Sequence, residues 1–163
     1  MSRTRSTARR RAVVATIAGT TLFFTLMQAP AAEAGSSNRW ARTLLRIVNH
    51  TRVNHDLRPW KMQRSLNGPS RRHSQDMVDD NRLYDPPNLE QILSHYPYDD
   101  LGADVVGCGN TLKELHRILM TEAFHRTILL HDDLRRVGIG VVKARQNNRC
   151  GRGSFWATEI MYG

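Results

Sequence analysis

Apolar residues recur at helical spacing near the start of the chain's globular part. Between Asn38 and Asn54, Leu44, Ile47 and Val48 share one face, and the arginines lie on the other side. This pattern predicts an amphipathic helix over residues 38–54. An extended connection through Trp60, which we expect to pack inward, leads to a second helix. That helix should begin near Pro69, because proline suits a first turn and interrupts a continuous helix.

The second half of the chain alternates short helices with apolar runs. A short helix is expected around Leu89–Leu93, then a strand over residues 101–109, and then a helix capped by Asn110 or Thr111. Residues 122–130 predict a separate short helix. Two β-rich runs, 135–144 and 154–163, flank a polar loop with glycines and predict an antiparallel hairpin. Helices come first and the main strands last, so the fold class is α+β.

The N-terminal segment has the layout of a secretory signal. Basic residues lie within 3–11, an uncharged apolar run covers 12–27, and small residues at Ala32 and Ala34 follow. We therefore expect cleavage after Ala34, with residues 1–34 as signal peptide and residues 35–163 as one domain. A membrane anchor is the alternative, but the apolar run is short and contains Gly19. The export route, general secretory or twin-arginine, stays open.

Charge narrows the classes of partner. The chain carries 24 Lys and Arg against 15 Asp and Glu. Removing the five arginines and one glutamate of residues 1–34 leaves 19 and 14, a net charge of +5. This net charge suits attraction of the protein to an anionic cell wall or lipid surface. The remaining sequence has no Lys/Arg-rich block of the kind that would indicate nucleic-acid binding. The processed protein is expected to be secreted and not to span a membrane.

Both cysteines, Cys108 and Cys150, lie in the expected domain. In an exported protein an even pair first indicates a disulfide, and two free thiols are the alternative. A bridge would close a loop of roughly 40 residues, which corresponds to about 3–4 kcal/mol of stabilisation.

Several segments in order resemble the bacterial branch of the CAP superfamily, the SCP-like relatives of cysteine-rich secretory and pathogenesis-related proteins. They are "LLRIVNHTRVNHDLRPW", "RRHSQDM", "LGADVVGCG", "FHRTILL", "RVGIGVV" and "FWATEIM". The resemblance covers about Trp40 to Gly163. It implies an α-β-α sandwich with a small antiparallel sheet between helical layers.

The family commonly has a cleft with two histidines and two acidic residues that can hold a divalent metal such as zinc. Carried onto this sequence, the resemblance places the second histidine at His125 and an acidic residue at Glu122. The position of the first histidine holds Asp85, and that of the other glutamate holds Ala103. One nitrogen and two carboxylates would bind zinc more weakly than a two-histidine site. The resemblance thus implies a degraded metal tetrad.

These residues also have ordinary structural interpretations. His125 could brace a turn, Asp85 precedes Pro86 as turn-forming residues do, and Glu122 could be a solvated charge. The sequence therefore favours a secreted binding or interaction module over an enzyme, with a lipid, a cell-envelope component or an exported protein as partner. The alternative is a metal-assisted hydrolase that uses His125 with Asp85 and Glu122. An envelope scaffold without a small ligand is a third hypothesis.

Overall fold

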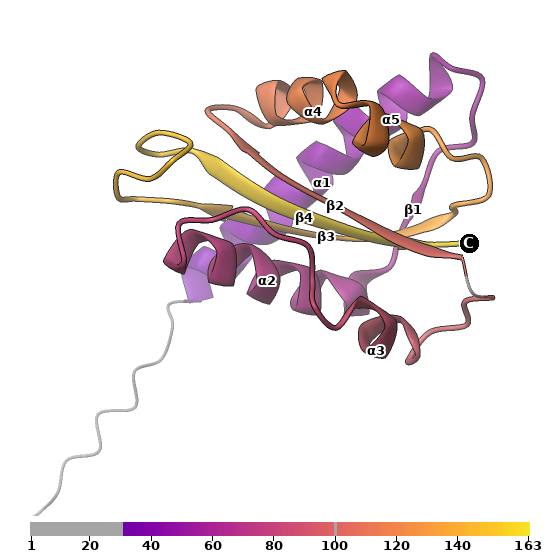
Figure 1. Cartoon of the computed structure of the whole chain (residues 1–163), viewed down its shortest axis with the longest axis horizontal. Helices are drawn as coiled ribbons and strands as arrows, with labels where there is room; N and C mark the ends of the chain where they lie inside the picture. Colours follow the sequence, from indigo (N-terminus) through magenta and orange to yellow (C-terminus); the bar gives the residue numbers. More distant parts are fainter. Residues whose placement is uncertain (1–30, 100) are drawn as a thin grey trace, which may run out of the picture.

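Helices cover both faces of a small sheet in the computed structural model, which describes residues 31–99 and 101–163 (Figure 1). The helices are α1 (Ala31–Val53), α2 (Asn67–Asp79), α3 (Leu89–Leu93), α4 (Leu112–Thr121) and α5 (Ala123–Leu129), with a 3-10 turn at Arg64–Leu66. The strands are β1 (Lys61–Met62), β2 (Gly102–Gly109), β3 (Arg136–Lys143) and β4 (Phe155–Tyr162). The expected α-β-α sandwich is confirmed.

The sheet has the order β1-β3-β4-β2. The predicted hairpin forms its centre, with β3 antiparallel to β4 and Val141 opposite Ala157. Strand β2 pairs antiparallel with the other edge of β4, and the short β1 runs parallel to β3. Strand β2 is therefore an edge strand, and its outer side is the place where loops and helices can enclose a cavity.

One face of the sheet carries the main hydrophobic core. Apolar side chains of α1 and α4 pack there against alternate residues of the strands, which point to the same face because strand side chains alternate. The fully or almost fully buried members include Leu44, Val48, Leu115, Leu119, Val137, Ile139, Val141 and Met161. Trp60 is buried in this cluster, as its sequence context predicts.

Helix α2 lies directly on β3 on the opposite face. A Cβ atom at Gly140 would stand only 2.1 Å from the Arg71 backbone nitrogen, so a side chain there would push the helix away. The close approach lets Ser70 donate to the Gly138 carbonyl and Ser74 to the Gly140 carbonyl, each at 3.1 Å. The glycines of "GIG" therefore allow α2 to pack closely against β3, and they are not turn residues.

The predicted elements are confirmed with shifted ends. Helix α1 begins earlier than residue 38, and α2 begins at Asn67 rather than near Pro69. Proline is tolerated in that first turn because the backbone N–H groups there have no helical partner. Thr111 is the N-cap of α4, and its hydroxyl accepts from the Glu114 N–H at 3.0 Å. The disulfide Cys108–Cys150 is also confirmed.

Most of the predicted signal segment, residues 1–30, lies outside the described residues. The predicted cleavage point after Ala34 falls in the first turn of α1. From residue 35 onward, Ser37 is the first buried side chain, and its hydroxyl donates to the Val141 carbonyl at 2.7 Å. Within the described ranges no helix is long and apolar enough to cross a membrane.

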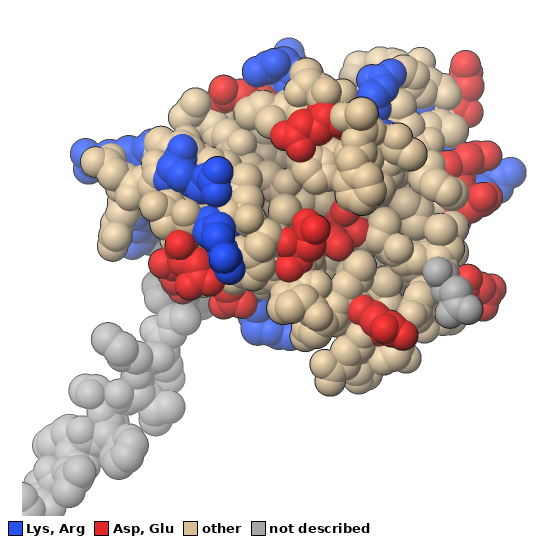
Figure 2. Space-filling model, viewed as in Figure 1, with Lys and Arg blue, Asp and Glu red and all other residues tan. Residues whose placement is uncertain are grey.

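Charged side chains are unevenly spread over the face seen in Figure 2. Several Lys and Arg residues gather at the end where the β3–β4 hairpin turns, with acidic residues beside them, and other Asp and Glu residues lie in the middle of the face and at the opposite end. The loop segment 143–153 accounts for much of this, since it contains one lysine, three arginines and no acidic residue. On this face, basic side chains are therefore most concentrated at the hairpin end.

One acidic side chain lies in the core itself. Glu159 stands at the middle of β4, opposite Val105 and Ile139, and none of its surface is exposed. Neither carboxylate oxygen has a hydrogen-bond partner among the described residues. Burial raises the pKa of Glu159 to about 8, so the carboxyl is mostly protonated at neutral pH.

The protonation of Glu159 predicts a pH-dependent stability. The folded-state pKa is raised above the unfolded value, so its stabilising effect is present below about pH 4.5 and is lost as pH rises through about 8. Glu159→Gln should remove this dependence and raise the free energy of unfolding at pH 8.5 by roughly 3–5 kcal/mol. Urea unfolding at pH 5 and pH 8.5 measures it. Equal pH dependence in both proteins would contradict the assignment.

Candidate functional site

The three residues predicted for the metal site line one cavity beside the edge strand β2. Its volume is about 490 Å³, and it lies between the loop after α2, strand β2 and the junction of α4 with α5. Asp85 comes from the loop, whereas Glu122 and His125 come from the helix junction. The disulfide borders the same cavity, together with Arg149 of the hairpin loop.

His125 and Glu122 contact each other directly. The Nδ1 atom of His125 lies 2.8 Å from a carboxylate oxygen of Glu122. Glu122 has an extended backbone that ends α4 and starts α5, and this break brings the side chain three residues later back towards it. The same Nδ1 atom has no hydrogen-bond partner among the described residues, so the contact is an approach within ion-pair distance, and the brace of the turn stays a prediction.

Asp85 has a second acidic neighbour that the sequence analysis did not identify. Asp104 lies on β2, on the same face as Val106 and Cys108, and one of its carboxylate oxygens is buried without a hydrogen-bond partner among the described residues. Burial, and then the negative charge of Asp85, raise the pKa of Asp104 to about 7. Ala103 packs instead against the core on the other face.

Beside the aspartates lies His73 of α2. Its Nδ1 atom lies 3.0 Å from the Thr158 hydroxyl, and its ring contacts Tyr84 edge to face. Burial lowers the pKa of His73, although Asp76 and Asp85 act in the opposite direction. This histidine therefore packs α2 against β4.

The arrangement does not gather a metal-ligand set. Among residues 31–99 and 101–163, no three His, Cys, Asp or Glu side chains lie close enough together to hold one ion. A zinc site needs three or four ligands at about 2 Å. These side chains, as placed, do not fit a shared ion, so we derive no reaction step through a metal here. The metal site remains a prediction from the family resemblance.

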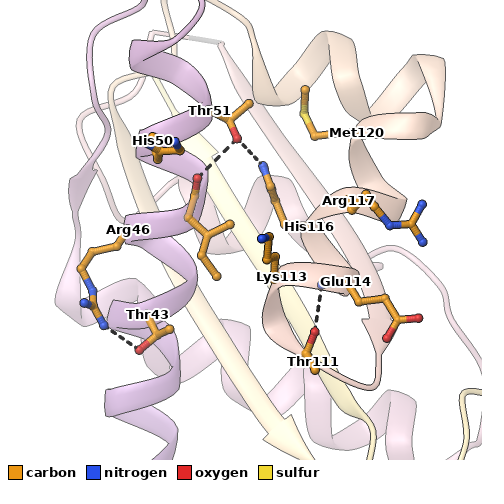
Figure 3. Close-up of a pocket in the computed structure, with 11 residues that line it drawn as sticks. Thr43, Arg46, His50, Thr51, Thr111, Lys113, Glu114, His116, Arg117 and Met120 are labelled. Atoms are coloured by element: carbon orange, nitrogen blue, oxygen red, sulfur yellow. Dashed lines mark hydrogen bonds between the residues drawn. The ribbon is translucent and has the colours of Figure 1, made fainter.

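A larger groove lies between α1 and α4 (Figure 3). Its volume is about 810 Å³. One wall comes from α1 and the other from α4 with its cap, and the lining residues are Thr43, Arg46, Ile47, His50, Thr51, Thr111, Lys113, Glu114, His116, Arg117 and Met120. The surface inside is mostly apolar, because the long basic side chains contribute their aliphatic stems and carry their charges outward.

His116 forms part of the wall of this groove. Its Nε2 atom lies 2.8 Å from the Thr51 hydroxyl across the groove, and its Nδ1 atom has no hydrogen-bond partner among the described residues. Burial lowers the pKa of His116 to about 4, so the ring is neutral at physiological pH. The α1–α4 contact is thus polar at one point but uncharged.

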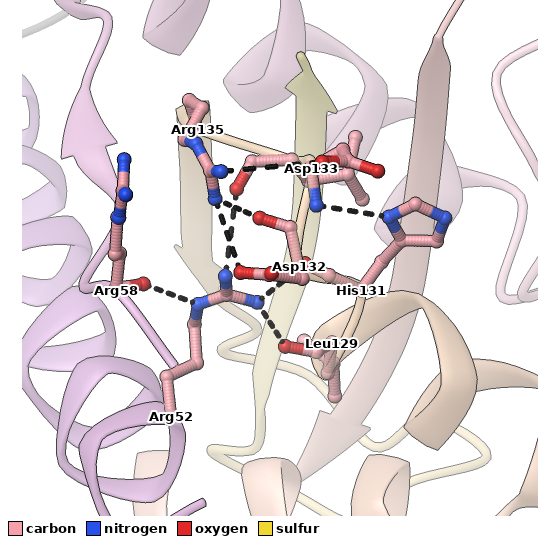
Figure 4. Close-up of polar contacts among 8 residues, drawn as sticks. Arg52, Arg58, Leu129, His131, Asp132, Asp133 and Arg135 are labelled. Atoms are coloured by element: carbon pink, nitrogen blue, oxygen red, sulfur yellow. Dashed lines mark hydrogen bonds and ion pairs between the residues drawn. The ribbon is translucent and has the colours of Figure 1, made fainter. Parts of the chain in front are cut away.

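The end of α1 that carries Thr51 is fixed by Arg52 (Figure 4). The guanidinium of Arg52 is fully buried, which corrects the expectation that the arginines of this helix face solvent. It donates to four backbone carbonyls, at 2.7 to 3.5 Å, and its charge lies 4.7 Å from the centre of the Trp60 ring. The acceptors belong to Arg58, Leu129, His131 and Leu134. Burial chiefly, and Arg135 to a lesser degree, lower its pKa.

A family model described as "CAP: Cysteine-rich secretory protein family" matches residues 45–160. A search of curated protein sequences finds no match.

Three solved bacterial structures share the fold. An extracellular protein containing an SCP domain from Bacillus anthracis aligns with TM-score 0.63 and 17% identity, over 83% of this chain and 44% of that one. An outer surface protein from Borrelia burgdorferi aligns with TM-score 0.61 and 10% identity, over 78% of this chain and 96% of that one. A cysteine-rich secretory protein from Staphylococcus aureus aligns with TM-score 0.60 and 18% identity, over 78% of this chain and 39% of that one. The chain thus spans less than half of two of these proteins.

The electrostatics beside Asp85 give a first prediction for this site. The Asp104 carboxyl should titrate near pH 7 in a carboxyl-detected NMR titration, and Asp85→Asn should lower its pKa because a neighbouring negative charge is removed. Asp132→Asn, in a loop that contributes nothing to the shift, is the control. A wild-type Asp104 that titrates near pH 4 would mean that the carboxyl is well hydrated.

Replacement of Arg52 gives a second prediction. Arg52→Met keeps the length of the side chain but leaves four carbonyl acceptors without their donor, so the free energy of unfolding should fall by about 3 kcal/mol or more. Arg46→Met, an exposed position on the same helix, should change it by less than about 1 kcal/mol. Urea unfolding compares the two variants. Similar small losses in both would show that Arg52 is not an anchor.

Proposed function

Because the chain belongs to the CAP family of cysteine-rich secretory proteins, we propose that it is a secreted binding module whose α1–α4 groove takes an anionic amphiphile. The observation that supports this ligand is a groove with an apolar interior and cationic edges. The disulfide and the extracellular or outer-surface descriptions of three proteins with the same fold support a location outside the cell.

The interior of the groove suits a hydrocarbon chain. Ile47 and Met120 supply apolar side chains, and the threonines add methyl groups. From Thr43 to Thr51 the α1 wall is about 12 Å long, since an α-helix rises about 1.5 Å per residue. An unbranched chain lying along this wall would gain roughly 25 cal/mol of binding free energy for each Å² of apolar surface that it buries.

The edges of the groove suit a negative headgroup. Arg46, Lys113 and Arg117 line it and have exposed side chains, whereas Glu114 is its only carboxylate among the described lining residues. That carboxylate is already engaged, because it accepts from the Asn110 backbone N–H at 3.0 Å in a capping arrangement of α4. The net positive edge therefore favours a carboxylate or phosphate over a neutral or cationic head.

The alternative, a metal-assisted hydrolase at the smaller cavity, has less support. His125, Glu122 and Asp85 share that cavity, but metal-assisted hydrolysis needs a bound ion that polarises the substrate or activates water. The described side chains do not bring three ligands together there. A binding role requires no such set, and we therefore prefer it.

The experiment is a fluorescence displacement titration with palmitate and, in parallel, hexadecanol. Palmitate should bind the protein, and Ile47→Gln with Met120→Gln should weaken it by about tenfold or more, since polar amides replace apolar contacts inside the groove. Arg46→Gln with Lys113→Gln should weaken palmitate but not hexadecanol, which has no charge to lose.

Val53 and Phe124 supply the matched control. They are 54% and 72% exposed and lie outside the groove lining, so changing both to glutamine removes apolar surface elsewhere. This double variant should bind palmitate like the wild type. The proposed ligand is wrong if neither amphiphile binds, or if the control loses as much affinity as the groove variant.

A further inference from the structure

A second groove lies at the basic end of the molecule. Its volume is about 880 Å³, and it is bounded by the first turns of α1, one side of α2 and the end of β3 with the loop that follows. Trp40, Arg71 and Lys143 represent these three segments. It shares no lining residue with the α1–α4 groove or with the cavity of His125. A ligand here would therefore occupy a different site from the amphiphile.

Positive charge dominates this second groove. Arg71, Lys143 and Arg145 line it against a single carboxylate, Asp79. Asp79 accepts from the side-chain amide of Gln75 at 2.8 Å. Among the described residues, neither Arg71 nor Lys143 has a carboxylate within ion-pair distance. The gathering of Lys and Arg over the hairpin end in Figure 2 agrees with this excess.

Uncharged polar groups and an aromatic ring complete the lining. Gln75, Gln146 and Asn147 present side-chain amides, each of which can both donate and accept hydrogen bonds. The partly buried Trp40 ring borders the groove and is held edge to face against Phe155, with 5.3 Å between ring centres. Lys143 lies over the same Phe155 ring, with its ammonium 5.2 Å from the centre.

The loop that forms one side is held in shape before any ligand arrives. The Asn148 amide donates to the carbonyls of Gln146 and Gly151, and its oxygen accepts from the Cys150 N–H at 2.9 Å. The next residue, Arg149, donates its backbone N–H to the Asn81 side chain at 2.8 Å. The disulfide at Cys150 ties the loop to β2. A preformed groove loses less entropy on binding.

We propose that this groove binds an anionic oligosaccharide. Amides that both donate and accept match the hydroxyl groups of sugars, and an aromatic ring offers a flat apolar surface to the carbon face of a sugar ring. Arg71 and Lys143 match carboxylate or phosphate groups on the same chain. A simple polyanion would use the cations but leave the amides and the tryptophan without a role.

The test is a calorimetric titration of the protein, expressed from the full chain, with three probes. They are an oligouronate of four to six sugars, a neutral oligomer of N-acetylglucosamine, and inorganic polyphosphate. The oligouronate should bind most tightly at physiological salt. Arg71→Gln with Lys143→Gln should weaken it by about tenfold or more, since two charge-assisted contacts are lost. Gln75→Ala with Asn147→Ala should weaken the oligouronate but leave polyphosphate unchanged.

Arg64→Gln with Arg72→Gln is the control for net charge. Both residues are exposed, neither lines the groove, and Arg72 lies on α2 next to Arg71. This variant loses the same two charges and should keep oligouronate affinity within about twofold, because long-range attraction is screened at physiological salt. In ¹⁵N-labelled protein, the side-chain amide signals of Gln75 and Asn147 should shift on binding.

Three results would overturn the proposal. The first is no oligouronate binding, and the second is polyphosphate binding as tightly as the oligouronate with no effect of the amide variant. The third is an equal loss of affinity in the charge control, because binding would then follow net charge rather than this groove.

Discussion

A buried guanidinium joins the end of helix α1 to two other segments of this domain. Arg52 reaches from the last turn of α1 to carbonyls on both sides of it, in the turn leading to β1 and in the segment between α5 and β3, so one side chain links three separate parts of the backbone. Each of these donors satisfies a backbone carbonyl, and the Trp60 ring covers one face of the guanidinium. The end of α1, which also forms one wall of the groove with α4, is thereby joined to the segment between α5 and β3.

The sheet imposes the second constraint, because helices cover both of its faces. On a strand whose two faces are both buried, polar side chains have no water to bind. Two neighbouring residues of β4 show how such side chains are accommodated. Thr158 is satisfied by hydrogen bonds with Ser74 and His73, whereas Glu159 has no partner and is kept neutral by a raised pKa. Asp104, on the edge strand β2, has a pKa raised to about 7. Burial thus raises the pKa of a carboxyl both on the central strand β4 and on the edge strand β2.

The sequence was sufficient for the elements, since periodicity, caps and turn residues act over short distances. The helix over 38–54, a helix with Pro69 in its first turn, the Thr111 cap and the final hairpin all follow from local pattern, and the disulfide follows from cysteine parity. The resemblance to the family supplied the layer order. Three features were not accessible: the burial of Arg52, the role of the two glycines beneath α2, and the influence of Asp85 on the pKa of Asp104. Each depends on contacts between residues distant in sequence, and a lone Asp within the apolar run "GADVVGCG" was the only local signal for the last.

The covalent bridge between β2 and the hairpin loop closes a ring of chain that contains α4, α5 and β3. Its two ends are 42 residues apart in sequence. Outside a cell, such a ring changes what a protease can achieve. A single cut in any exposed turn of the ring, such as the one between α5 and β3, leaves both pieces bonded to one another, and the strands on either side remain paired in the sheet. A cleaved molecule would therefore persist as a two-chain protein, and its lifetime would be set by reduction of the bridge as much as by proteolysis.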